Sequence, residues 1–192
     1  MNLLTDALPA AIEADGRRYG ILTDFRDWMK FSEMIHDRET SSAEKALMMA
    51  WWVDGQPEIT EGLVQAVLDF YKAAALFPPP AADDQTDEEA PQKPPVFDWT
   101  VDAAFVLADF RRYYGMDLLT TDFLHWWEFL SLFLALPDDS GCRNRIRIRS
   151  QDLSKIKNRA ERDRIRKMQE SIALPWEPDE DFGAEIWESM GL

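Results

Sequence analysis

His125 and Glu128 are the first residues whose types and spacing could support chemistry. They lie three positions apart in a segment with helical periodicity, so both side chains would face the same way and could share a metal ion. A metal site needs more ligands than this pair, and His36, the only other histidine, has no paired partner in the sequence. The ligand count therefore favours a hydrogen-bonded, partly buried His125, and we predict no metal and no cofactor.

Cys142 is the second candidate, because the neighbouring Arg143 and Arg145 could stabilise a thiolate. No general base or orienting acid is evident beside it. The sequence also contains no phosphate-binding glycine loop, nucleophile elbow or paired-carboxylate signature. A single cysteine excludes an internal disulfide and favours a cytosolic protein. We therefore predict a cytoplasmic protein that is not an enzyme.

The charge is distributed unevenly along the chain. The net charge is −15 at pH 7, yet residues 143–167 hold eleven of the 21 Lys and Arg residues and only three acidic residues. Eleven cations and three acids give this basic segment a charge of +8, so the rest of the chain carries −23. Such an asymmetry indicates a recognition face.

Three interpretations of the basic segment stay open: it could bind phosphates, dock an acidic partner or the chain's own acidic end, or form a solvated face. The acidic remainder of the chain would repel nucleic acid, which disfavours that partner. The candidate interaction residues come from this segment and from residues 175–192, which contain six acidic residues and no Lys or Arg. They are Arg145, Arg149, Lys155, Arg159, Arg162, Arg166, Trp176 and Trp187.

The stretch 122–137 predicts the central core helix. Thr120, Thr121 and Asp122 offer N-cap side chains, and Pro137 would end the helix. Its apolar residues follow helical spacing and leave little polar surface: Phe123, Trp126, Trp127, Leu130, Phe133 and Leu134. The apolar run is too short to cross a bilayer, which needs about 20 residues.

The remaining patterns predict a mainly α fold, a compact domain of about six helices with a small N-terminal β-hairpin. Asp15-Gly16 is typical of a type I′ turn and pairs Ile12 with Tyr19. The expected helices, besides 122–137, are 24–36, 41–52, 60–76, 100–114 and 152–173, with caps at Thr23-Asp24, Ser41 and Thr60. Residues 143–149 alternate like a strand but border helical sequence, so helix is favoured.

The domain organisation follows from composition. We expect a single mainly helical domain over residues 1–174, interrupted by a disordered acidic, proline-rich loop at 78–96. Residues 175–192 would form an acidic C-terminal tail. Methionine and tryptophan residues gather between positions 28 and 52. They could form a groove for apolar helices, but such clusters more often belong to a core.

Several segments resemble the bacteriophage gene-product-fifteen family of siphophage tail-region proteins. The segments are Asp15-Gly16-x-x-Tyr19-x-Ile21-x-Thr23-Asp24-Phe25-Arg26-x-Trp28, Phe110-x-x-x-Tyr114-Gly115-Met116-Asp117-Leu118, Leu124-His125-Trp126-Trp127-x-Phe129-x-x-Leu132-Phe133-x-x-Leu136-Pro137 and Ile148-Arg149-x-x-Asp152-Leu153-Ser154-Lys155-Ile156.

The resemblance implies a tail assembly chaperone of a phage or prophage, acting in the host bacterial cytosol. Its partner would be the tape-measure protein or another tail assembly protein, and the resemblance supplies no catalytic residues. Two alternatives remain: a structural virion component, such as a connector or tail-completion protein, and a nucleic-acid-binding adaptor using residues 143–167. Self-association is also left open.

Overall fold

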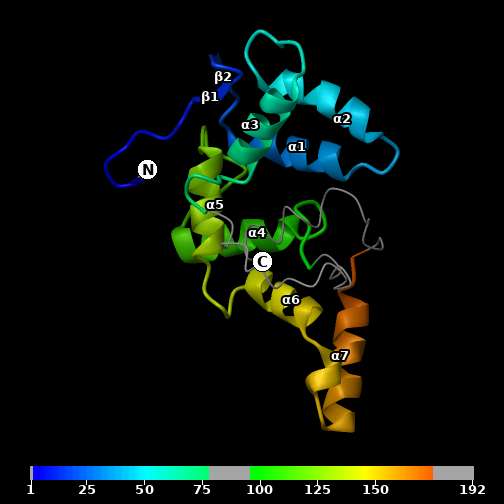
Figure 1. Cartoon of the computed structure of the whole chain (residues 1–192). Coiled ribbons are helices and arrows are strands. Elements are labelled where there is room, and N and C mark those ends of the chain that lie inside the picture. The colour runs from blue at the N-terminus through cyan, green and yellow to red at the C-terminus, as the bar shows by residue number, and fades with distance from the viewer. Residues whose placement is uncertain (1, 78–95, 175–192) are drawn as a thin grey trace.

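The structure is a computed structural model that describes residues 2–77 and 96–174 (Figure 1). This part of the chain contains seven α-helices and one two-stranded antiparallel sheet, which confirms the predicted mainly helical fold with an N-terminal hairpin. The expected loop at 78–96, apart from Val96, and the expected tail with Trp176 and Trp187 lie outside the described residues.

The hairpin consists of β1 (Ala11–Ala14) and β2 (Arg17–Gly20). Its register pairs Ile12 with Tyr19, as predicted, around a turn in which Asp15 has φ 51° and Gly16 has φ 72°. These positive φ values define the turn that the Asp-Gly dipeptide favours. The Asp15 carboxylate accepts a hydrogen bond of 2.5 Å from the Thr60 hydroxyl, so the turn is fastened to the next helical layer.

The first helical layer contains α1 (Phe25–His36), α2 (Ser42–Met49), the 3-10 turn η1 (Ala50–Trp52) and α3 (Glu61–Tyr71). The predicted caps are confirmed. Ser41 and Glu44 form a reciprocal capping box, and the Thr60 hydroxyl accepts the Leu63 amide at 3.1 Å. Local side-chain chemistry therefore fixes where α2 and α3 begin.

The next helical stretch begins later than predicted and changes pitch. Residues 98–101 form a turn in which the Asp98 carboxylate accepts two backbone amides. They are followed by α4 (Ala103–Asp109) and the π-helical turn η2 (Phe110–Tyr114). Gly115, with φ 64°, ends the stretch as predicted, because glycine enters the left-handed region without steric cost.

Helix α5 (Trp126–Leu134) is shorter than predicted, so the prediction that it begins at Asp122 is wrong. The Phe25 amide donates to the Leu124 carbonyl at 3.0 Å, and the Trp126 amide donates to the Thr23 carbonyl at 2.7 Å. This antiparallel bridge holds residues 124–125 extended and delays the helix. Phe123, which was expected to be in the core, is 58% exposed.

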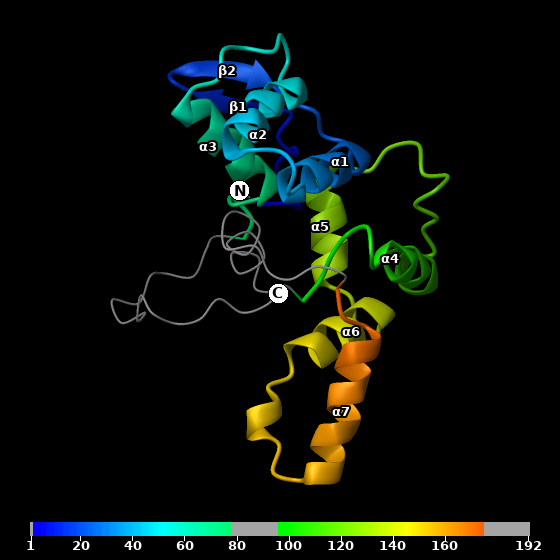
Figure 2. The same cartoon turned by 90° about the vertical axis from the view of Figure 1, so that its right-hand side faces the viewer.

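The basic segment forms α6 (Gly141–Ser150), the 3-10 turn η3 (Leu153–Lys155) and α7 (Arg159–Ser171). Helix at 143–149 is confirmed, but the predicted continuous helix over 152–173 is wrong. Asp152 and Asn158 each cap a new turn, with hydrogen bonds of 2.9 Å and 3.1 Å to later amides. In both views α7 lies beyond α6, on the side away from α1, α2 and α3 (Figures 1 and 2).

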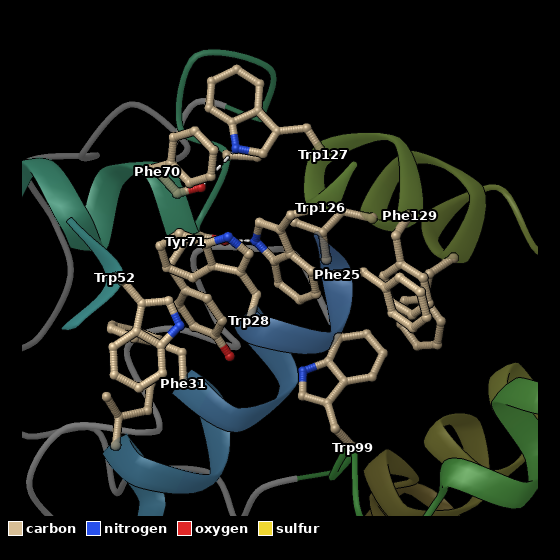
Figure 3. Packing of buried hydrophobic residues seen from close by; sticks show 14 of the residues in the cluster. Phe25, Trp28, Phe31, Trp52, Phe70, Tyr71, Trp99, Trp126, Trp127 and Phe129 are labelled. Atoms are coloured by element: carbon tan, nitrogen blue, oxygen red, sulfur yellow. Dashed lines mark hydrogen bonds between the residues drawn. The ribbon is translucent and has the colours of Figure 1, made fainter. Parts of the chain in front are cut away.

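The core is centred on α5, as predicted. Trp126, Phe129 and Leu130 have no exposed surface. Trp126 stacks on Tyr71 at 5.5 Å between ring centroids, with the rings 5° from parallel (Figure 3). The Trp126 indole N–H donates to the Tyr71 carbonyl, and that of Trp127 donates to the Phe70 carbonyl, both at 2.7 Å. These bonds satisfy carbonyls at the end of α3 while the aromatic rings fill the core.

Candidate protein-interaction surfaces

His125 and Glu128 do not form a metal site. The Nδ1 atom of His125 accepts the Trp127 amide at 3.1 Å, and Nε2 donates to the Pro9 carbonyl at 3.0 Å. Both nitrogens are thus used by the fold, and burial lowers the pKa of His125, so the ring is neutral. Glu128 faces solvent. Within residues 2–77 and 96–174, no cluster of three potential ligands could hold a metal ion.

Cys142 is fully buried, and its backbone amide helps to anchor the start of α6. The Cys142 and Gly141 amides donate to the two carboxylate oxygens of Asp109, at 2.8 Å and 3.0 Å. Burial, followed by the Asp109 carboxylate, raises the pKa of the thiol well above its ordinary value, and this outweighs the opposing effect of Arg145. The thiolate that the flanking arginines could have stabilised is therefore disfavoured.

Arg145 and Arg149, two predicted interaction residues, point inward. Asp102 has no exposed surface, and its carboxylate binds Arg145 Nε at 2.6 Å and Arg149 Nη1 at 2.5 Å. Arg149 also donates to the carbonyls of Val96 and Ile172, at 3.0 Å and 2.7 Å. We call this group the Asp102 clamp. It occupies both guanidinium groups in holding α4, α6 and the end of α7 together, so neither group presents a free charge to a partner.

The other predicted basic residues lie on the outer part of the segment. Lys155, Arg159 and Arg166 are exposed, and Arg162 is half-buried. Lys155 pairs with Asp152, and Arg159 and Arg166 pair with Asp163, at 3.4–3.9 Å on the surface, where such pairs contribute little. The basic segment thus contains two inward arginines on α6, which form the clamp, and outward cations on η3, α7 and at Arg147 of α6.

The methionine and tryptophan cluster is mainly core. Trp28, Trp52, Met34 and Met49 are buried, which confirms that interpretation for these four residues. Trp51 differs, because it is 59% exposed and stands one helical turn after Leu47, which is 63% exposed. The tandem Trp51-Trp52 gave no indication of which ring points outward. The spacing of Leu47 and Trp51 could have suggested a shared face.

We call this surface the α2 face, formed by Leu47, Met48 and Trp51. Beside Leu47 and Met48 is a hollow of about 360 Å³ whose lining also includes Glu39, Thr40 and Glu44. Two carboxylates therefore border an apolar surface, and no Lys or Arg is part of the lining. A second pair of exposed apolar side chains, Leu119 and Phe123, belongs to the turn and loop between Gly115 and α5.

No helix in the described part of the chain has the length and apolar character needed to cross a membrane.

The family model described as "Bacteriophage Gp15 protein" matches residues 4–174. The matched region includes the hairpin, the tryptophan-rich core and the basic segment, and with them every segment that carries the resemblance. No curated protein and no solved structure matches the chain.

Proposed function

Because the chain belongs to the Bacteriophage Gp15 protein family, we propose that it is a non-enzymatic tail morphogenesis protein of a phage or prophage. More specifically, we propose a tail assembly chaperone in the host cytoplasm that binds the tape-measure protein. Its task would be to keep the long apolar helix of that protein soluble while tube subunits add. The observation that carries the proposal is the family match over residues 4–174.

The use of the reactive side chains supports a non-enzymatic role. His125 caps α5, the Cys142 thiol is buried, and the Asp102 carboxylate is neutralised by two arginines. Each of these three groups is therefore engaged in building the fold.

The surface supports a role in holding another polypeptide. A net charge of −15 favours the solubility of a complex that contains an apolar helix. Leu47 and Trp51 are exposed on a helical layer that is fixed by caps and aromatic packing. Large apolar side chains in such a position are typical of residues that anchor a helix of a partner protein.

Co-expression with the tape-measure protein of the same phage or prophage tests the proposal. We expect the tape-measure protein to be insoluble alone, and to be soluble and co-purified when this chain is present. The comparison is made at low and at moderate salt, because apolar contacts persist where surface charge is screened. If no complex forms at either salt concentration, the tape-measure proposal is wrong.

Mass spectrometry of purified virions separates the chaperone from a structural component. A chaperone should be missing from finished particles, whereas a connector or tail-completion protein should be present in fixed amount.

Gel shifts over a salt series test the nucleic-acid alternative, since phosphate binding must weaken steeply as salt rises. With Arg145 and Arg149 held by Asp102, that alternative depends on the exposed Arg147 of α6 and on the cations between residues 155 and 167.

A further inference from the structure

We propose that the α2 face is the docking site for one amphipathic helix of a partner protein, with apolar side chains on one side and Lys or Arg residues beside them. The inference rests on the proposed function, because it names the surface and the chemistry by which the chaperone would hold its partner. Four observations lead to it: side-chain direction, rigidity, the state of the Trp51 indole, and charge.

The direction of the side chains creates a continuous apolar surface. Along α2 and η1, Met49 and Trp52 are buried in the core, while Leu47 and Trp51 are more than half exposed. Residues four apart on a helix lie above one another, so Leu47 and Trp51 share a face, and the half-buried Met48 borders it. Methionine and tryptophan adapt well to different apolar helices.

The α2 face is held rigidly in the absence of a partner. The capping box of Ser41 and Glu44 fixes the start of α2. At the other end, the indole N–H of Trp52 donates to the Asp27 carbonyl of α1 at 2.9 Å, and the Trp52 ring meets Phe31 edge to face. A surface that needs no reordering loses less conformational entropy on binding.

Trp51 differs in its hydrogen bonding from four of the buried tryptophans. The indole N–H groups of Trp28, Trp52, Trp126 and Trp127 all donate to backbone carbonyls. Among the contacts of residues 2–77 and 96–174, the Trp51 indole has no hydrogen bond and is open to solvent. Tryptophan is among the residue types enriched at the energetic centre of interfaces, where its indole N–H can find a hydrogen-bond partner.

The carboxylates beside the α2 face indicate which kind of helix would bind there. Glu39 and Glu44 line the hollow next to Leu47. Hydrogen bonds from the side chain and backbone of Ser41 lower the pKa of Glu44, so its carboxylate is ionised at neutral pH. The chain as a whole carries −15, which would also steer cations toward it. A helix with basic flanks thus fits this surface, and an acidic helix does not.

Fluorescence anisotropy with two designed peptides tests the assignment. Both peptides are labelled amphipathic helices of about 18 residues, one built from Leu and Lys and the other from Leu and Glu. Leu47→Asp and Trp51→Ala are compared with the matched control Leu119→Asp, which alters an exposed leucine elsewhere on the surface. Circular dichroism checks that each variant is folded.

We expect the unmodified chain to prefer the Leu/Lys peptide. Leu47→Asp and Trp51→Ala should each weaken its binding by about tenfold, and Leu119→Asp should change it by less than about twofold. Leu47→Asp adds a negative charge, so binding driven by charge alone would become stronger. Unchanged affinity in both α2 variants, an equal loss in Leu119→Asp, or preference for the Leu/Glu peptide overturns the assignment.

The same variants, co-expressed with the tape-measure protein, distinguish the two proposals. If the tape-measure complex forms with the unmodified chain and survives Leu47→Asp and Trp51→Ala, the α2 assignment fails and the proposed function stands. If the Leu/Lys peptide binds through Leu47 and Trp51 but no tape-measure complex forms, the tape-measure role fails and the docking site stands.

Discussion

Asp102 is a fully buried carboxylate whose charge is compensated by Arg145 and Arg149. Asp102→Asn would leave two guanidinium groups facing a neutral amide in a desolvated position. We expect the free energy of unfolding to fall by about 3 kcal/mol, measured by urea denaturation. Asp163→Asn, which breaks only exposed pairs on α7, should change it by less than about 0.5 kcal/mol. Equal effects of the two substitutions would contradict the clamp.

The two histidines predict a pH dependence of stability. Burial lowers the pKa of both His36 and His125 below the ordinary value of 6.5. Below that pH the unfolded chain binds protons that the folded chain does not, so folding stability is lost as pH falls through the window beneath 6.5. We expect the free energy of unfolding to decrease from pH 7 to pH 5, where most carboxylates are still ionised.

His125→Asn isolates the contribution of one histidine. An asparagine side chain can still accept the Trp127 amide at the start of α5, but it does not titrate. Urea denaturation at pH 7, 6 and 5 should therefore show a smaller decrease for His125→Asn than for the unmodified chain. A decrease of the same size in both proteins would mean that His125 is not responsible.

Single residues also show why parts of the site could not be predicted from sequence. Asp102 lies 43 and 47 positions before its arginine partners, and nothing local marks it as buried. The same arginines were counted in the basic segment 143–167, which was predicted to be a recognition face. His125 was correctly expected to be hydrogen-bonded and partly buried, but its role as the cap of α5 depends on a bridge to Asp24, far away in the chain.

Elements governed by local chemistry were predicted well. The Asp15-Gly16 turn set the register of the hairpin, and the Ser41 and Thr60 caps set the starts of α2 and α3. The helix at 152–173 was predicted without a break because its apolar spacing was followed through Asn158. That residue could have signalled a new N-terminus, since asparagine is a favoured cap.

Gly20, at the end of β2, lies against Asp54 in the turn that follows η1. A Cβ atom added at Gly20 would lie 2.0 Å from the Asp54 Oδ2 atom, and the Asp54 amide donates to the Gly20 carbonyl at 2.9 Å. We expect Gly20→Ala to lower the free energy of unfolding by about 0.5–1 kcal/mol, because the exposed Asp54 side chain must turn aside into a less favourable rotamer.

Removing the obstructing carboxylate provides the reverse test. Asp54→Ala should restore most of the stability lost in Gly20→Ala, and the four proteins form a double-mutant cycle measured by thermal or urea unfolding. If the effects of Gly20→Ala and Asp54→Ala simply add, the close approach is not the cause of the loss.

At the scale of the molecule, burial is concentrated away from α7. Helix α5 buries five residues, whereas α7 buries only Ile165. Hydrogen exchange measured by mass spectrometry should therefore be slowest in α5 and fastest, among the helices, in α7. Protection of α7 equal to that of α5 would contradict this order. A selective gain of protection in α2 when a partner binds would agree with docking on the α2 face.

One buried cluster includes side chains from Ile12 near the N-terminus to Ile146 in α6. We propose on this basis that residues 1–174 fold as one domain, with the basic segment joined to it through the Asp102 clamp. The sequence predicted the central position of α5, because a stretch with so many large apolar residues is usually buried in a folded protein. The exposure of Trp51 could not be predicted in the same way, because it depends on tertiary packing.

The contacts of Arg149 indicate where a peptide could be inserted into the chain. Its guanidinium group binds the carbonyls of Val96 and Ile172, close to where residues 78–95 and 175–192 join the fold, and the Phe77 amide is held by the Ala73 carbonyl. Because these junctions are anchored, we expect a reporter peptide inserted after Phe77 or after Leu174 to leave the helices in place. Such an insertion would carry a fluorescent or affinity label while the α2 face stays intact.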